Sequence, residues 1–468
     1  MKEFLSPRLL DSFLERTIDA LPSGFPHSTP DCAALGRAWT ELGIRPGDLV
    51  LLCLPNSREL LHNFFGVMMA GGVPALLSPL TPAARLREIA TAMGACAVGA
   101  LRLTTGDLGA VSYQRIGHLQ IALLEAPPEP AAAPGELVLM TSGTSGISSG
   151  CVFDFEAILL NGKRHADAIG QRADDTVLLN LPLHFSFALS SQALASLTRG
   201  NRLIVSGPPF HQAGYQEALK QFGVTVSSLT PVHIRSFFQS DPSALTGLRV
   251  LSVGGDQLDL ELATRLVELR KGKDVYLTYG LTQAGPRVCT LAAHTAPASR
   301  YGSVGLPHEG TEVSLHPIED GSGRKQLYVK SATVMKRTIG CVEGRAQDLV
   351  APQTIATGDA FEIDVEGNLY FKGRLSDFIS RKGEKISLAT VRRLTSGIPH
   401  VVRAKTHILK HSDGGEDFDL ELCVDPAYLA SQQSSELHTN LRHLLRRTEM
   451  PHAVHIEPAS ELDAQRYK

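Results

Sequence analysis

Residues 137–150 read LVLMTSGTSGISSG, and here an apolar run gives way to a loop made almost entirely of Gly, Ser and Thr. Small residues let the backbone curl until several N–H groups converge on one anion, and hydroxyl groups add further donors. Residues 137–140 are typical of a buried strand, and an apolar pattern resumes at residues 151–155, so the loop is short and held at both ends. The stretch predicts a phosphate-binding loop and therefore a nucleotide site.

The loop differs from the P-loop of kinases and GTPases. That motif, GxxxxGK followed by Ser or Thr, needs a Lys-Ser or Lys-Thr pair at the start of a helix, and no such pair follows these glycines. Two alternatives remain at this point: a nucleotide site of another kind, or a solvated Ser/Gly linker.

Further segments, in order along the chain, resemble the adenylate-forming superfamily, the AMP-binding enzymes that include acyl- and aryl-CoA ligases, luciferases and nonribosomal adenylation domains. Residues 140–150 are similar to the family's phosphate loop, which ends in x-P-K-G. The family's Y-G-x-T-E resembles YGLTQ at residues 279–283, and its T-G-D resembles residues 357–359. Its G-R-x-x-D resembles residues 373–377, with Gly383 beyond them. Four ordered motifs are far more specific than one.

The resemblance implies that the chain activates a carboxylate with ATP and Mg²⁺. The implied nucleotide-binding residues are Thr141, Ser142, Gly143, Thr144, Ser145, Gly146, Gly254, Gly255, Asp256, Tyr279, Gly280, Asp359 and Arg374. The loop would hold the β- and γ-phosphates, and Asp359, an acceptor-only carboxylate, would bind the ribose hydroxyls. Arg374 would add a cationic fork near ribose or phosphate. Residues 254–256 would lie along the adenine, with Tyr279 stacked on it.

The implied catalytic residues are Thr282, Gln283, His184 and Lys468. Thr282 would touch the α-phosphate, and Gln283 would offer an oxygen to the metal. Lys468 lies near the place of the family's C-terminal lysine; the alternative is a solvated tail. His184 lies one position before the family's acyl-pocket histidine, a place that Phe185 takes in strict register, so either a local shift restores the role or the role is lost.

Three departures from the family pattern concern charge and motion. Ser149 replaces the loop lysine, with Ser148 in place of the preceding proline, which removes one positive charge near the pyrophosphate. Gln283 replaces a glutamate, and an amide attracts a hard cation less strongly. Ser376 replaces the usual Asp or Lys of the hinge, where a small polar residue can still serve.

The composition of the chain limits its size class, its partners and its cellular compartment. The 468 residues, 43% of them hydrophobic, can bury a sizeable core and more than one domain. A formal net charge of −3 gives no basic field for nucleic acid. The seven scattered cysteines lack CxxC pairs, which argues against disulfides and zinc and favours a reducing cytoplasm. The most apolar stretch, residues 64–80, is interrupted by Gly and Pro, so we expect a buried helix leading into a strand and no membrane span.

Apolar runs alternate with helical patterns along most of the chain, which predicts an α/β fold with layered, mostly parallel sheets. The expected strands are residues 49–53, 137–140, 176–179, 202–205, 224–229 and 248–253, and the expected helices are residues 58–69, 82–93 and 260–270. Shorter elements follow, with strands at residues 403–409 and 418–424 and a helix at residues 436–447. We therefore expect a large N-terminal domain at residues 1–373 and a small, mobile α+β domain at residues 374–468, hinged near Ser376.

The sequence thus predicts an ATP-dependent ligase that forms an acyl- or aryl-adenylate and pyrophosphate. The acyl group would then pass to coenzyme A, to the phosphopantetheine of an acyl carrier protein, or to an amine. Residues 227–232, Gly254 and residues 280–284 would form a mainly apolar pocket, which favours an aryl or medium acyl acid. The alternative is a degenerate homologue that binds nucleotide or acyl-adenylate and acts through a partner protein, as the charge lost at Ser149 and Gln283 suggests.

Overall fold

The computed structural model describes most of the chain. The described residues are 6–21, 31–103, 106, 108–125, 127–141, 149–207, 210–318, 323–340, 349–375, 378–381, 384–410, 416–429, 434–445 and 447–459. The predicted loop residues Ser142, Gly143, Thr144, Ser145 and Gly146 lie outside these ranges, as do Ser148, Ser376, Gly383 and Lys468.

The chain divides into two compact units. The first contains residues 1–314, 328–357 and 364–369, and the second contains residues 315–327, 358–363 and 370–468. The domain boundary between residues 373 and 374 that the sequence suggested stays a prediction.

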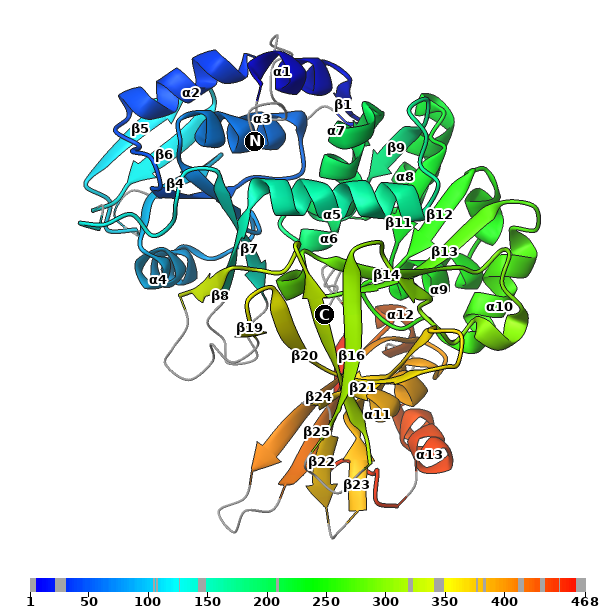
Figure 1. The fold of residues 1–468 in the computed structure, drawn as a ribbon. Coiled ribbons are helices and arrows are strands. Elements are labelled where there is room, and N and C mark those ends of the chain that lie inside the picture. Colours follow the sequence, from blue (N-terminus) through cyan, green and yellow to red (C-terminus); the bar gives the residue numbers. More distant parts are fainter. Residues whose placement is uncertain are drawn as a thin grey trace. The chain divides into compact units, whose positions relative to one another are not determined.

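The first unit contains an eight-stranded sheet, counted over the described residues, with the order β1-β10-β9-β11-β12-β13-β14-β15. Its strands are β1 (Thr17–Asp19), β9 (Thr176–Leu179), β10 (Arg202–Val205), β11 (Val226–Leu229), β12 (Val250–Val253), β13 (Asp274–Gly280), β14 (Arg287–Ala292) and β15 (Leu306–Pro307). Pairing is parallel from β1 to β13, and β14 and β15 add antiparallel partners. This sheet is mostly green in Figure 1.

Three helices connect the central strands of this sheet: α8 (Gln212–Phe222), α9 (Pro231–Gln239) and α10 (Leu260–Leu269). Asp259 begins α10, because its carboxylate accepts a hydrogen bond from the Leu262 N–H at 2.9 Å. Apolar side chains of all three helices join the strands in one buried cluster, including Tyr215, Phe237 and Leu266. The central strands are short and buried on both faces, as parallel strands between helices require, although serines interrupt the apolar runs of β11 and β12.

A second eight-stranded sheet of the first unit, again counted over the described residues, has the order β18-β8-β7-β3-β2-β4-β6-β5. Its strands are β2 (Leu49–Cys53), β3 (Val73–Leu76), β4 (Ala95–Ala100), β5 (Ser112–Ile116), β6 (Leu119–Leu123), β7 (Glu136–Thr141), β8 (Ser149–Asp154) and β18 (Arg337–Ile339). The strands β4, β2, β3 and β7 are parallel, and antiparallel strands flank them.

Four of the described helices accompany this second sheet. They are α1 (Pro7–Glu15), α2 (Cys32–Glu41), α3 (Arg58–Met69) and α4 (Ala83–Met93). Of these, α3 and α4 pack on its strands. Ser57 caps α3, accepting a hydrogen bond from the Leu60 N–H at 3.1 Å. The buried face of α4, with Leu86, Ile89 and Met93, packs on the strands.

A group of helices follows β8 and β9 in the chain. It consists of α5 (Phe155–Ala168), α6 (Ser186–Ala188), the π-helix η1 (Leu189–Leu194) and α7 (Ala195–Arg199). The 3₁₀ turns are η2 (Pro242–Thr246), η3 (Thr282–Ala284) and η4 (Ala298–Arg300). A five-stranded sheet is formed by β16 (Thr311–Pro317), β17 (Lys325–Ser331), β19 (Leu349–Ala351), β20 (Thr354–Ile363) and β21 (Leu369–Arg374), in which β21 pairs with β20.

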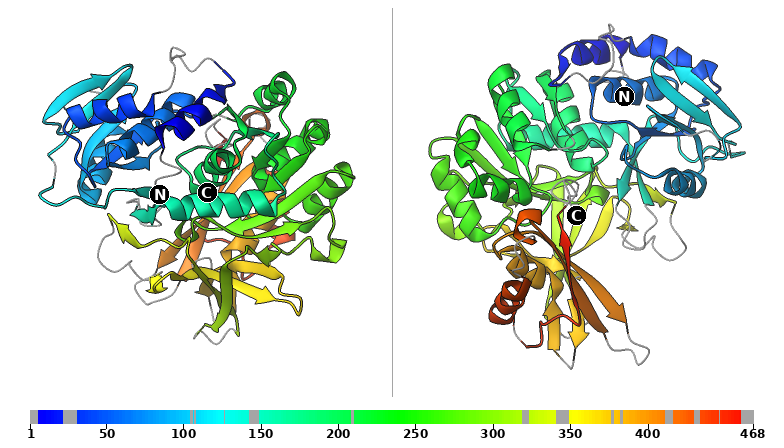
Figure 2. Two further views of the ribbon diagram at one scale, coloured as in Figure 1. Left: turned by 45° about the horizontal axis from the view of Figure 1, so that its top comes forward. Right: turned by 180° about the vertical axis from the view of Figure 1, so that it is seen from behind.

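The end of the chain forms an α+β arrangement. Its elements are the hairpin β22 (Phe378–Arg381) and β23 (Glu384–Ser387), the sheet strands β24 (Val401–Lys410), β25 (Glu416–Val424) and β26 (Val454–Pro458), and the helices α11 (Leu388–Ser396), α12 (Pro426–Leu429) and α13 (Ser434–Leu444). Leu437 and Leu441 of α13 pack with Phe418 of β25 in one core, and Figure 2 shows the orange-to-red strands with their helices.

The predicted α/β fold class with a small C-terminal α+β part is confirmed. Parallel pairing dominates the middle of both large sheets, and antiparallel strands are added at their edges. Among the helices that the structure describes, none combines the length and hydrophobicity needed to cross a bilayer.

Candidate functional site

Four parallel strands of the first sheet end at the same edge. Because neighbouring parallel strands point in one direction, the segments after β9, β11, β12 and β13 emerge together. These segments carry His184, Thr230, Gly254 and Thr282. The fold therefore gathers predicted residues of three separate motifs at the carboxyl edge of one sheet.

Two hydroxyl groups define the centre of this edge. Thr282 begins η3, directly after β13, and its Oγ1 lies 3.0 Å from the Oγ of Ser186 in α6. Both side chains are buried, with 8% of each residue exposed. The β7 strand lies beside η3, so the strand that leads into the predicted phosphate loop passes next to Thr282.

Thr141 and Ser149 close the base of the predicted phosphate loop. They face each other in the antiparallel register of β7 and β8. Thr141 Oγ1 lies 2.8 Å from Ser149 Oγ and donates to the Ser149 carbonyl oxygen at 3.1 Å. The hydroxyl at the family's lysine position is therefore engaged within the hairpin.

Gly254 and Gly280 allow the chain to approach itself closely. A Cβ on Gly254 would lie 2.3 Å from Thr278 Oγ1, and one on Gly280 would lie 2.0 Å from the Pro286 carbonyl oxygen. Neither position can hold a side chain without movement of its neighbours. Gly255, with a φ of 92°, and Asp256 are exposed beyond the strand end, so their backbone faces solvent.

Tyr279 and Gln283 are both partly buried. Tyr279 is on β13, where the register with β14 shifts between Tyr279 and Gly280. The backbone carbonyl of Gln283 accepts a hydrogen bond from the Met335 N–H at 2.9 Å, which fixes the turn that carries its amide.

His184 lies in the segment after β9, next to Phe185, with ring centroids 4.5 Å apart. Burial lowers the pKa of His184 to about 4, so its imidazole is neutral at neutral pH. A neutral ring can donate or accept one hydrogen bond, which suits a group that binds a carboxylate or an acyl oxygen.

The sequence interpretation missed Arg287, the first residue of β14. The residue is 3% exposed. Its guanidinium lies with Cζ 4.1 Å from the centre of the Phe187 ring and donates from Nη1 to Thr278 Oγ1 at 2.9 Å. Asn161 of α5 binds both backbone groups of Arg287, at 2.8 and 2.9 Å. The only sequence signal was a charged residue inside the apolar run that follows YGLTQ.

Two buried histidines lie near Arg287. His165 of α5 and His308 have ring centroids 6.5 Å apart, and His308 Nε2 lies 2.9 Å from Thr290 Oγ1. Burial, reinforced by the positive charge of Arg287, lowers the pKa of both rings, to about 4 for His308. Both imidazoles are therefore neutral at neutral pH and add no charge around Arg287.

The second unit carries the predicted ribose-binding pair. Asp359 of β20 is 3% exposed, and Arg374 at the end of the paired strand β21 places Nε 3.5 Å from Asp359 Oδ1. The guanidinium is half exposed, so most of its donors remain accessible to a ligand.

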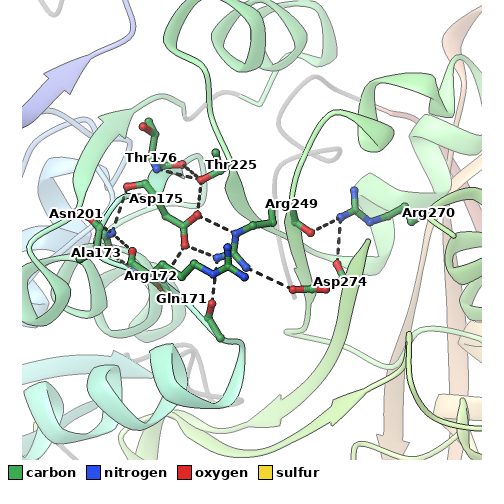
Figure 3. Close-up of polar contacts among 11 residues, drawn as sticks. Gln171, Arg172, Ala173, Asp175, Thr176, Asn201, Thr225, Arg249, Arg270 and Asp274 are labelled. Carbon is green, nitrogen blue, oxygen red and sulfur yellow. Dashed lines mark hydrogen bonds and ion pairs between the residues drawn. The ribbon is translucent and has the colours of Figure 1, made fainter. Parts of the chain in front are cut away.

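The opposite, amino edge of the first sheet is held by a charged network (Figure 3). Asp175, just before β9, accepts two hydrogen bonds from Arg249, which also lies 3.4 Å from Asp274 at the start of β13. Thr225, before β11, donates to Asp175 at 2.8 Å. Since these residues lie just before their strands or, for Asp274, at the first residue of β13, the network lies at the opposite edge of the sheet from Thr282 and joins the strands there.

Known proteins share this fold and parts of this sequence. The family model described as "AMP-binding enzyme" matches residues 30–337. The chain is 22% identical over 445 residues to 4-coumarate-CoA ligase 1 of Narcissus pseudonarcissus, covering 88% of this chain and 80% of the relative. It is 28% identical over 389 residues to a feruloyl-CoA synthase of Amycolatopsis, covering 79% and 77%. The solved structure of o-succinylbenzoate CoA synthetase from Bacillus subtilis, with its acyl-adenylate, matches with a TM-score of 0.74 at 19% identity, covering 96% and 94%.

Proposed function

Because the chain belongs to the family of AMP-binding enzymes, we propose that it is a ligase that activates a carboxylic acid with ATP. The family match confirms the resemblance to adenylate-forming enzymes that the sequence suggested. The observation that carries the proposal is the pair Thr282 and Ser186, whose hydroxyls meet where four parallel strands end, beside the strand that enters the phosphate loop.

In the first half-reaction, a carboxylate oxygen attacks the α-phosphorus of ATP. A bond forms between this oxygen and the α-phosphorus. The bond from the α-phosphorus to the oxygen that bridges to the β-phosphorus breaks, and pyrophosphate leaves with its electron pair. Two anions repel, so the site must supply donors to the phosphate and hold both reactants in line. Thr282 Oγ1 is the donor that we assign to the α-phosphate, and Ser186 orients it.

In the second half-reaction, a nucleophile takes the acyl group and AMP leaves. With a thiol, the sulfur bonds to the carbonyl carbon, the C–O bond to AMP breaks, and the thiol proton goes to solvent. The CoA-dependent relatives favour coenzyme A as the acceptor, and a carrier-protein phosphopantetheine or an amine are the alternatives. Coumarate and ferulate in the relatives' names support an aryl acid as the first class to test.

Magnesium would be held chiefly by the ATP phosphates. Among the described residues, no three His, Cys, Asp or Glu side chains gather as a metal site, so a dedicated protein cage does not fit this part of the chain. The Gln283 amide oxygen is the group that we propose as a protein ligand, because Mg²⁺ commonly combines few protein oxygens with substrate phosphates. The ion would offset phosphate charge when bound.

The remaining nucleotide contacts are part of the same proposal. The backbone after β12, at residues 254–256, would face the adenine, and Tyr279 would stack on it. Asp359 and Arg374 would bind the ribose, while the loop of residues 141–146 and Lys468 would contact the phosphates. The six cysteines that the structure describes are buried and form no disulfides, and we propose a reducing cytoplasm as the location.

The experiment that tests this function is ATP–pyrophosphate exchange with purified protein, Mg²⁺ and a panel of aryl, fatty and amino acids. We expect exchange with one class of acid, and its loss in Thr282→Val and Lys468→Ala. Asp241→Asn changes an exposed capping residue before η2 and should leave exchange unchanged. It controls for losses that come from preparing any variant protein. Exchange that persists undiminished in Thr282→Val would refute the assigned role.

One observation favours a second candidate, the nucleotide-binding homologue that acts through a partner protein. The Ser149 hydroxyl, at the family's lysine position, is held by Thr141 and brings no positive charge. If the parent shows no exchange but binds ATP or AMP, and Ser149→Lys with Gln283→Glu creates exchange, this second candidate is correct. An active parent excludes it.

A further inference from the structure

Arg287 is a buried cation without a matching anion. Within the described part of the chain its side chain makes one hydrogen bond, to Thr278 Oγ1, and its Nε has no partner. A guanidinium has five N–H donors, and burying one without partners is costly because it loses its hydration. The remaining donors of Arg287 are therefore available to another group.

A second buried arginine shows what a purely structural guanidinium looks like in this chain. Arg270 is 1% exposed and donates to the backbone carbonyl oxygens of Leu245, Leu248, Arg249 and Asp274. These four acceptors lie in η2, just before β12 and at the start of β13, so the guanidinium joins these segments to the end of α10. Arg287 lacks any such set of acceptors among the described residues, so a structural role does not account for its charge.

The groups around Arg287 supply no negative charge to balance its guanidinium. The titratable groups that act to raise its pKa are Cys289 and Tyr279, and neither is a carboxylate. The nearby rings of His165 and His308 are neutral, and their protonation would add repulsion. An acidic group from outside this set is needed to balance the guanidinium.

The position of Arg287 shows where that acid would come from. A Cβ on Gly254 would lie 2.9 Å from its Nη1, and one on Gly280 would lie 3.1 Å from its Nη2. The guanidinium thus packs closely against the backbone of two glycines, next to Phe187. Ser186, the neighbour of Phe187, contacts Thr282, so this place adjoins the proposed reacting centre on the acyl side.

We propose that Arg287 binds a second carboxylate of the acid that is activated, so that the substrate class is a dicarboxylic acid. The inference rests on the proposed ligase function and narrows its substrate. One carboxylate reacts at Thr282, while the other forms a charge-assisted, bidentate pair with the guanidinium, the geometry for which arginine is best suited. Phe187 supports the guanidinium from one face and packs against the carbon chain or ring between the two carboxylates. The predicted apolar pocket then has one charged end.

Matched acid pairs test the proposal. ATP–pyrophosphate exchange is compared for benzoate against terephthalate and for hexanoate against adipate, with the parent, Arg287→Met and Arg287→Lys. We expect the parent to prefer at least one dicarboxylate over its partner, and Arg287→Met to lose that preference by about 10- to 100-fold in kcat/KM, the worth of a charge-assisted hydrogen bond. Arg287→Lys should keep part of it, because the charge remains but the fork does not.

Arg265→Met is the matched control. Arg265 also lies over an aromatic ring, with Cζ 4.6 Å from the Phe238 ring centre, but it is half exposed on α10. Its removal should change neither the acid preference nor the exchange rate.

Thermal unfolding gives a readout that does not depend on turnover. Compared with AMP alone, AMP with terephthalate or adipate should raise the Tm of the parent further and give no further rise in Arg287→Met. Without ligand, Arg287→Met should melt no lower than the parent, because the substitution removes an unpaired buried charge; a merely structural arginine would give a lower Tm.

The outcomes separate the two proposals. Equal exchange with both members of every pair, unaltered in Arg287→Met, overturns the dicarboxylate inference and leaves the ligase function standing. No exchange with any acid, together with Arg287-dependent stabilisation by a dicarboxylate, overturns the ligase function and supports the binding site. If the protein shows no exchange with any acid and no stabilisation by a dicarboxylate, both proposals are overturned.

Discussion

The Oγ atoms of Ser186 and Thr282 lie 3.0 Å apart although the two residues are 96 positions apart in the sequence. The contact joins the segment after β9 to the segment after β13. It exists because the parallel register brings the carboxyl ends of these strands to one edge, so that the loops that follow them lie close together.

Thr282→Val should lower ATP–pyrophosphate exchange more than Ser186→Ala. The first substitution removes the donor that we assign to the α-phosphate and leaves Ser186 with a buried hydroxyl lacking its partner, a loss of about 1–3 kcal/mol. The second keeps the Thr282 hydroxyl and removes only its orienting neighbour. We therefore expect a fall of at least about 100-fold in kcat for Thr282→Val and a smaller fall for Ser186→Ala, measured by initial rates of exchange. Equal losses would show that Ser186 is as important as Thr282.

Gly254→Ala should destabilise the first unit. Its methyl group would lie 2.3 Å from Thr278 Oγ1, which forces a shift of β13 or of the Thr278 side chain, at about 1–3 kcal/mol. Adding Thr278→Ala removes the clashing oxygen, so the double variant should recover part of the loss. Urea unfolding midpoints measure both.

Gly302→Ala is the control for that series, because nothing lies within 4 Å of a Cβ placed there. Its midpoint should stay within about 0.5 kcal/mol of the parent. A Gly254→Ala protein as stable as Gly302→Ala would contradict the packing described around Thr278.

Asp359→Asn should weaken ATP binding selectively. The buried carboxylate is the acceptor that we assign to the ribose diol, and an amide in its place presents donors to hydroxyls and to Arg374. We expect the KM for ATP to rise at least about tenfold while the KM for the acid stays within about twofold. The matched control is Asp364→Asn, since Asp364 accepts hydrogen bonds from Glu366 and Asn368 within its own turn. It should lower stability and leave the KM for ATP unchanged.

Stability should fall as the pH drops below about 6.5 toward 4, and His308 should account for part of the fall. Its folded pKa of about 4 lies below the ordinary value, so in this window the unfolded chain binds a proton that the folded chain does not. The contribution is fully present above pH 6.5 and is lost as the pH falls through this window toward pH 4, on the order of 1–3 kcal/mol. His308→Gln should flatten the pH dependence of the urea midpoint. An unaltered slope would place His308 in a solvated environment.

Asp175→Asn should lower stability without affecting catalysis. Burial, the largest single influence, acts to raise the pKa of Asp175, but the hydrogen bonds from Arg249, the Arg172 backbone and Thr225, with the charge of Arg249, together lower the pKa below its ordinary value. The carboxylate therefore stabilises the fold at pH values above its ordinary pKa, and that stability is lost as the pH falls through the lowered pKa. The amide breaks the charge pair, and we expect a loss of about 1–3 kcal/mol in unfolding free energy. Because the network lies at the amino edge, the KM values for ATP and acid should not change. Altered KM values would show that the two edges are coupled.

The sequence predicted the elements whose apolar pattern matches their geometry. The expected helix at residues 58–69 corresponds to α3, and the expected strands at residues 49–53 and 176–179 correspond to β2 and β9. The helix at residues 82–93 begins one residue later, after Pro82. In each of these, the burial that stabilises the element is visible as periodicity in the chain itself.

Other features depend on distant contacts and left no local pattern. The β5 strand reads SYQRI and is mostly polar, because it is an edge strand that pairs only with β6. Arg287 looks like a surface charge in the sequence, and its burial comes from Phe187 and Asn161, each from another part of the chain. Asp175 and Arg249 are likewise joined only by strand register. Tertiary contacts of this kind are invisible to a one-dimensional pattern.

The separation of the two edges of the first sheet also bears on how such a protein can change over generations. Asp175, Arg249 and Arg270 join the strands at one end. The sheet is therefore stabilised independently of substitutions in the loops at the other end. Under the proposed role of Arg287, its exchange for another residue would change the acid that is bound while the scaffold persists. In this molecule, the residues that can vary with the chemistry and the residues that maintain the fold lie at opposite ends of the same strands.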